Sequence, residues 1–162
     1  APADIAAIDV RVPLAGARYP GCDAHGPFDH VLQGKMSIQF NVAATLVSGA
    51  AGEHNFALLD DAAVRGLIAR TTLTVDEALT AAYPGAQGAE VVLTLRDGHV
   101  LRRRLDDVRF ASADEVRARF KAALTEAFDA AHADAVDAAI ESFDSLADAG
   151  DLPRLLRRAR RA

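Results

Sequence analysis

The sequence predicts an α+β domain of two layers, with a small antiparallel sheet and helices on one face, followed by C-terminal helices. Three patterns support this. Apolar and charged residues alternate near the N-terminus, an Asp-Gly pair at residues 97–98 separates two strand-like runs, and apolar residues recur at helical intervals elsewhere. A strand, then helices, then a run of strands places the helices on one face of the sheet.

The first strand is predicted at residues 8–12, where apolar and charged side chains alternate, and Pro13 ends it. Residues 14–30 are rich in Gly and Pro, so we expect a long loop without regular structure. Long loops inside compact domains are usually functional or mobile, which makes this segment a candidate for function.

Two helices are expected after the loop. Ser37 is a suitable N-cap for the first helix, and Gly49 fits its C-terminal end. The second helix is expected over residues 61–70. Their apolar stripes consist of Phe40, Ala43, Ala44 and Val47 in the first helix and of Val64, Leu67 and Ile68 in the second.

Three more strands are predicted beyond the helices. Residues 72–75 predict a short strand, and residues 78–88, which contain a Pro-Gly pair, are expected to be irregular. Residues 90–96 and 100–105 predict the two strands of a hairpin. Asp97-Gly98 lies between them, and both residue types tolerate the positive φ of a two-residue turn.

The C-terminal part predicts further helices. Ser112 and Glu115 form a capping box before a helix with Val116, Phe120, Leu124 and Phe128 on one face. Another helix is expected to carry Val136, Ile140, Phe143 and Leu146, and a short last one Leu152, Leu155 and Leu156. These apolar stripes have little of their own chain to cover them, so we expect them to dock elsewhere, as in a dimer.

Composition sets limits on the class of protein. The chain has 162 residues with a net charge of −5 and one cysteine, which indicates an acidic domain in a reducing, cytoplasmic compartment. An acidic body argues against nucleic acid as a partner, and there is no apolar run of about 18 residues for a membrane span. Only two lysines accompany many arginines, a weak sign of a GC-rich bacterial genome. The first residues contain neither an initiator Met nor the basic and apolar segments of a signal peptide, so we expect that the chain is a piece of a longer protein.

Most of the possible catalytic or metal-binding motifs in the sequence are weak indications of function. Cys22, His25 and His30 share the loop, which makes a metal site conceivable, but no zinc spacing is present, so ordinary polar loop residues are the preferred interpretation and we expect no metal. The Gly34–Ser37 stretch departs from the sequence pattern of a phosphate-binding loop, so we do not expect nucleotide binding. The Arg-rich end could bind an anion, although cations at a helix C-terminus are the preferred interpretation.

One group of residues favours binding of a carboxylate. Lys35 and Ser37 stand just before a predicted helix N-terminus, after a loop that carries Arg18, Tyr19 and His25. Backbone N–H groups and cations could converge there on an anion. The alternative is that Lys35 is solvated and Tyr19 packs on the domain, and spacing alone leaves both open.

The same region resembles a known family. The matching motifs are Tyr19-Pro20-Gly21-Cys22-Asp23, Gly26-Pro27-Phe28, Val31-Leu32-Gln33-Gly34-Lys35-Met36-Ser37-Ile38-Gln39-Phe40 and Val42-Ala43-Ala44. They resemble the MmgE/PrpD family, nearest to members akin to iminodisuccinate epimerase. Residues 93–98 are similar to a late hairpin of the family, and Arg119-Phe120-Lys121 to one of its helices.

The resemblance implies a larger parent enzyme. Residues 1–125 would form its α+β lid, and residues 126–162 would pack on a helical domain of the same protein. Family members include 2-methylcitrate dehydratase, cis-aconitate decarboxylase and iminodisuccinate epimerase, lyases and isomerases that act on small polycarboxylates without a cofactor. Their shared step is removal of a proton next to a carboxylate.

The resemblance also implies that most catalytic acids and bases lie in the helical domain. The catalytic residues are therefore unknown from this chain, and the isolated fragment is expected to be inactive. Lys35 and Ser37 are the first candidates for substrate binding. A stand-alone binding or assembly module is the alternative, and the sequence does not separate dehydration, decarboxylation and epimerisation.

Overall fold

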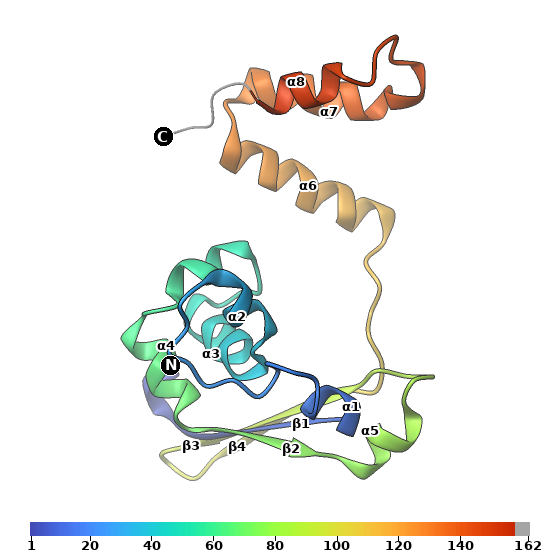
Figure 1. Cartoon of the computed structure of the whole chain (residues 1–162). Helices are drawn as coiled ribbons and strands as arrows, with labels where there is room; N and C mark the ends of the chain where they lie inside the picture. The colour runs from blue at the N-terminus through green and yellow to red at the C-terminus, as the bar shows by residue number, and fades with distance from the viewer. Residues whose placement is uncertain (158–162) are drawn as a thin grey trace. The chain divides into compact units, whose positions relative to one another are not determined.

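The computed structural model describes residues 1–157, which form two compact units, and the second begins at Arg109 (Figure 1). The α+β class is confirmed by a four-stranded sheet and several helices. Arg158, Arg160 and Arg161 of the basic end lie outside the described residues. None of the described helices is long and apolar enough to cross a membrane.

The sheet of the first unit has the strand order β2-β1-β3-β4. Strands β3 and β4 form the predicted antiparallel hairpin, and Gly98 in its turn has a φ of 90°. Strand β1 pairs with β3 in antiparallel orientation and with β2 in parallel. The strands are β1 (Ile5–Val12), β2 (Thr71–Val75), β3 (Ala89–Leu95) and β4 (Val100–Leu105).

The prediction of a small antiparallel sheet was wrong for β2. This strand lies beside β1 rather than β3, and the sheet is mixed. The long helical connection from β1 to β2 returns the chain to the end of the sheet where β1 began, so β2 runs parallel to β1. The alternation of residue types in the sequence predicts that a segment is a strand, but it does not determine which strand pairs with it.

The predicted N-cap Ser37 is confirmed in the first unit, and a second helix of this unit has Asp61 as its N-cap. The Ser37 hydroxyl accepts a hydrogen bond from the Phe40 N–H, and the Asp61 carboxylate caps the next helix in the same manner. Gly49 ends the first of these helices with a φ of 83°. The helical elements are η1 (Pro2–Asp4), α1 (Leu14–Ala17), α2 (Val31–Met36), α3 (Ile38–Ser48), η2 (Glu53–Leu58), α4 (Ala62–Ile68) and α5 (Glu77–Ala82).

Two segments predicted to be irregular contain short helices. Helix α1 follows Pro13 directly, and α5 lies within the segment before the hairpin. Helix α5 begins because the Asp76 side chain accepts a hydrogen bond from the Leu79 N–H, a cap that the downstream Pro-Gly pair obscured. The rest of residues 18–30 forms a loop, as expected.

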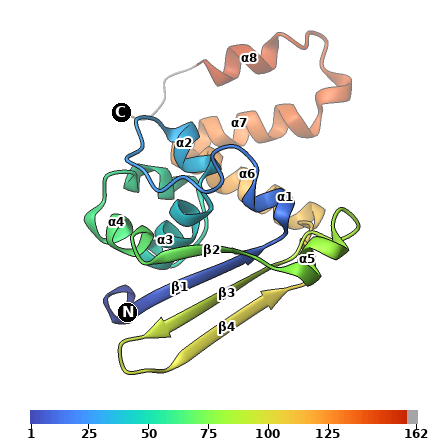
Figure 2. The same cartoon turned by 60° about the horizontal axis from the view of Figure 1, so that its bottom comes forward.

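The core of the first unit lies between the helices and one face of the sheet (Figure 2). Ile8, Val10 and Val12 of β1 point into it and are buried, and Phe40 of α3 has no exposed surface. Asp9 and Arg11 alternate with them and lie on the opposite face. The face of β1 that points to the helices is therefore apolar and covered, and its opposite face is charged.

The second unit is a small helical assembly with its own core. Leu124, Phe128, Ala133 and Val136 are buried, and Leu152 and Leu155 pack against them. The predicted capping box of Ser112 and Glu115 is confirmed. The elements are α6 (Ala113–Ala127), α7 (Ala130–Glu141), η3 (Phe143–Ser145) and α8 (Asp151–Leu156).

The predicted apolar stripes of this unit are covered only in part. Val136 is buried within the unit, whereas Ile140 is 37% exposed and Phe143 49% exposed. Helix α7 ends at Glu141, before Phe143, so the expected long helix is interrupted. Docking of the exposed part on another body stays a prediction.

Candidate functional site

The loop of residues 18–30, α2 and the first turn of α3 form one region, here called the α3 corner. The loop is fastened to the start of α3 by two hydrogen bonds. The Ile38 N–H donates to the Cys22 carbonyl oxygen at 2.9 Å, and the Ser37 hydroxyl donates to that of Ala24 at 2.5 Å. Phe28 anchors the far end of the loop, because its buried ring packs edge-on against Phe40 at 5.4 Å.

Lys35 lies in the last turn of α2 and is partly exposed. Its Nζ is 3.0 Å from Oε2 of Glu53, and it lies over the ring of Phe56 at 4.9 Å from the centroid. The side chain of Glu53 is 80% exposed, so this ion pair is well solvated and weak, about 0–1 kcal/mol. The ammonium is thus held in place by a ring and a replaceable carboxylate.

Ser37 is fully buried, and its hydroxyl has two partners, Ala24 and Phe40. It therefore joins the loop to the helix and positions both. Asn41 strengthens the same junction, since its Nδ2 donates to the carbonyl oxygens of Ser37 at 2.7 Å, Gly34 at 3.0 Å and Lys35 at 3.1 Å. The end of α2 consequently lies against the first turn of α3.

The other predicted site residues lie at the surface of the loop. Arg18, Tyr19 and His25 are exposed, and Tyr19 is 59% exposed. Within residues 1–157, no hydrogen bond or ion pair joins their side chains to Lys35. Ser37 contacts the loop and Lys35 contacts η2. The five side chains of the predicted binding site do not all lie together.

Sequence reasoning missed two features of this corner. Glu53 and Phe56 come from η2, far from Lys35 in sequence, and no local pattern pairs them. Gln39 has no exposed surface, and neither its Oε1 nor its Nε2 has a hydrogen-bond partner among the described residues. Each such unmade bond costs about 1–3 kcal/mol. The signal in the sequence that could have indicated this residue is a Gln one helical turn before Ala43 of the apolar stripe.

Cys22 has little nucleophilic character. Burial raises the pKa of its thiol, and the nearby Asp23 raises it further, so the thiolate is disfavoured. His25 and His30 share its loop, but no three His, Cys, Asp or Glu side chains gather as a metal site would need within the described part of the chain.

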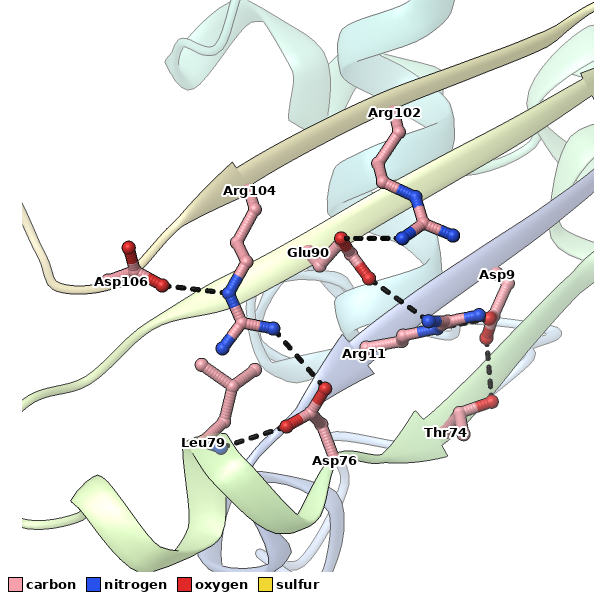
Figure 3. A network of polar contacts seen from close by, with 9 residues as sticks. All are labelled: Asp9, Arg11, Thr74, Asp76, Leu79, Glu90, Arg102, Arg104 and Asp106. Carbon is pink, nitrogen blue, oxygen red and sulfur yellow. Dashed lines mark hydrogen bonds and ion pairs between the residues drawn. The ribbon is translucent and has the colours of Figure 1, made fainter.

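The opposite face of the sheet carries a second polar region, here called the charged sheet face (Figure 3). Glu90 lies at its centre with a side chain only 5% exposed, 3.1 Å from Nη1 of Arg11 and 3.6 Å from Nη1 of Arg102. Arg104 bridges Asp106 at 2.7 Å and Asp76 at 3.3 Å. The region consists of Asp9, Arg11, Thr74, Asp76, Glu90, Arg102, Arg104 and Asp106.

Two carboxylates of this face, those of Asp9 and Asp76, are held in their charged form. Burial raises the pKa of Asp9, but hydrogen bonds from Thr74 and Arg11 outweigh it, and the net pKa is below the ordinary 3.8. A hydrogen bond from the Leu79 N–H lowers the pKa of Asp76, and Arg104 adds to this. Each ion of the face is thus stabilised by neighbours within the chain, which is the arrangement of a structural network.

The comparison with known proteins supplies the family. The model of the MmgE/PrpD C-terminal domain matches residues 1–145, which is most of the chain. No curated protein sequence matches it. Since the match runs through the α3 corner, the sheet and the first helices of the second unit, the chain belongs to the MmgE/PrpD family as its C-terminal domain.

Proposed function

We propose that this chain is the C-terminal part of a bacterial, cytoplasmic lyase or isomerase that acts on a small polycarboxylate. Its reaction begins with removal of a proton next to a carboxylate and proceeds to dehydration, decarboxylation or epimerisation. The general base belongs to an N-terminal helical domain of the same protein, on which residues 126–162 pack. The α3 corner then supplies groups that bind the substrate, and the isolated chain is inactive.

The observation that carries this proposal is the setting of Lys35. Its ammonium is fixed over Phe56, and the exposed Glu53 can leave it at little cost. A carboxylate of the substrate can take the position of Glu53, with the charge already in place. Closure of a second domain over this corner would exclude water and strengthen the new pair.

The remaining candidates have supporting roles in this proposal. Arg18 and His25 are exposed on the loop and can approach a second carboxylate, and Tyr19 can donate its hydroxyl. Ser37 holds the loop on α3 through Ala24, so its contribution is to position these groups. No metal or organic cofactor is needed for proton removal beside a carboxylate when cations stabilise the developing charge.

The test is Lys35→Ala in the full-length protein. We expect kcat/KM to fall about 30-fold or more, because a substrate charge would lose its partner. Lys121→Ala is the matched control, since Lys121 is also partly exposed and pairs with Asp137 at 3.0 Å, but in the second unit. Equal changes of less than about threefold in both variants would contradict the role of Lys35.

A stand-alone assembly module is the second candidate, favoured by the exposed apolar residues of the second unit, Ile140 and Phe143. Such surfaces drive association, and a homodimer is the expected product for the chain alone. Sedimentation of the chain checks this. A monomer at high concentration would argue against both the module and the proposed docking of the C-terminal helices.

A further inference from the structure

We infer that Gln39 is a substrate-binding residue of the same site and that it selects polycarboxylates carrying an O–H or N–H group beside a carboxylate. This inference rests on the proposed function and names its substrate more closely. The side-chain amide of Gln39 is buried in the fold without a hydrogen-bond partner among the residues that the structure describes.

Gln39 differs from the other buried or half-buried amides of its unit. Asn41 donates to three carbonyl oxygens, and Asn55 donates to that of Ala50 at 3.0 Å. Among the buried side chains of residues 1–157, Gln39 has both its donor and its acceptor unpaired, whereas Asn55 lacks a partner only at Oδ1. Burying an amide in this state destabilises a fold, and a Leu or Met of similar size would avoid the cost. The side chain therefore contributes to something other than folding.

The place of Gln39 in α3 indicates what it binds. It is the second residue of an eleven-residue helix, and side chains there lean back toward the helix N-terminus. The neighbouring N–H groups of Ile38 and Phe40 already have acceptors, whereas the described hydrogen bonds include none for the N–H of Gln39. Free N–H groups and the dipole at this end favour an anion.

The two ends of the carboxamide then define the ligand. A carboxylate accepts from the backbone N–H and from one of the two N–H groups of Nε2, which gives each nitrogen an acceptor. Oε1 still needs a donor, and a bare carboxylate has none to offer. A hydroxyl, amine or imine N–H beside the carboxylate completes the set. A hydroxy or amino polycarboxylate therefore fits, and an unsaturated acid without such a group leaves Oε1 unpaired.

Gln39 has no exposed surface, so a ligand can reach it only if a neighbouring segment moves, and we assign this movement to the loop of residues 18–30. It covers α3 through the Cys22 and Ala24 carbonyl oxygens, and both contacts are hydrogen bonds to groups at the helix N-terminus. A substrate carboxylate can replace them there. Gly21 and Gly26 have φ values of 85° and 82°, so the turns that shape this cover depend on glycine. Lys35 is fastened to the same helix through Asn41 and lies ready for a second carboxylate.

The experiment measures the affinity of the full-length protein for two matched pairs, citrate with tricarballylate and aspartate with succinate. In each pair only the first molecule has the O–H or N–H donor. We expect the wild type to prefer the donor-bearing member of at least one pair by about tenfold, and Gln39→Leu to abolish that preference. Unfolding of Gln39→Leu should need as much denaturant as the wild type or more.

Several results would overturn the inference. A preference that survives Gln39→Leu within about twofold would do so, as would a clear loss of stability in both Gln39→Leu and the length-preserving Gln39→Met. Asn55→Leu is the control and should be destabilised, because its donors have partners. If no polycarboxylate binds the wild type, the proposed function fails with it. If binding depends on Lys35 but not on Gln39, only this inference fails.

Discussion

On the charged sheet face every carboxylate drawn in Figure 3 has a partner within the chain, whereas at the α3 corner the buried Gln39 has none. Glu90 is as buried as many core residues, yet two guanidinium groups reach it. The only ion pair described for Lys35 at the corner joins it to the exposed Glu53. A network with its charges satisfied holds strands together, and a region with unsatisfied or replaceable partners is suited to a ligand.

The largest expected effect comes from removing the centre of the charged sheet face. Glu90→Ala leaves Arg11 and Arg102 without their shared carboxylate and should lower the free energy of unfolding by about 2 kcal/mol. Glu53→Ala is the matched change at the α3 corner and should cost about 0.5 kcal/mol or less, because that pair is solvated. Urea unfolding compares them, and equal losses would erase the distinction between the two regions.

A smaller effect is expected at the junction of loop and helix. Ser37→Ala removes the cap of α3 and the contact to Ala24, at a cost of about 1 kcal/mol, and should make the loop of residues 18–30 more sensitive to protease. Ser112→Ala removes the cap of α6 and should cost a similar amount without affecting the loop. Equal loop cleavage in both variants would mean that Ser37 does not fasten it.

The smallest effect is a dependence on pH that belongs to the charged sheet face. The folded pKa values of Asp9 and Asp76 lie below the ordinary 3.8, so their stabilisation is complete above that value and is lost as the pH falls through the folded values. The variant Asp9→Asn/Asp76→Asn should therefore lose less stability than the wild type below about pH 4. Parallel curves of unfolding free energy against pH would show that these groups do not contribute.

Local signals predicted much of the fold. The Asp97-Gly98 turn, the Ser37 cap and the capping box at Ser112 each act over a few residues, so their chemistry can be read from neighbours in sequence. The parallel pairing of β2 with β1 was missed, because a strand pattern does not state which edge it joins. Helix α5 was missed because its cap precedes a Pro-Gly pair.

The candidate site was predictable only in part, for the same reason. Lys35 and Ser37 stand out in the sequence because they precede a capped helix. The partners that decide their behaviour, Glu53 and Ala24, lie many residues away and meet them only in the folded chain. The unpaired state of Gln39 is a property of its surroundings, so no pattern in the sequence could show it.

The central claim is that the α3 corner, and not the charged sheet face, meets the substrate. Hydrogen exchange of the full-length protein with and without a bound polycarboxylate tests this most directly. We predict slower exchange of amides in residues 20–40 on binding, by about tenfold or more, and no change in residues 90–105. Protection confined to residues 90–105, with residues 20–40 unchanged, would contradict the account.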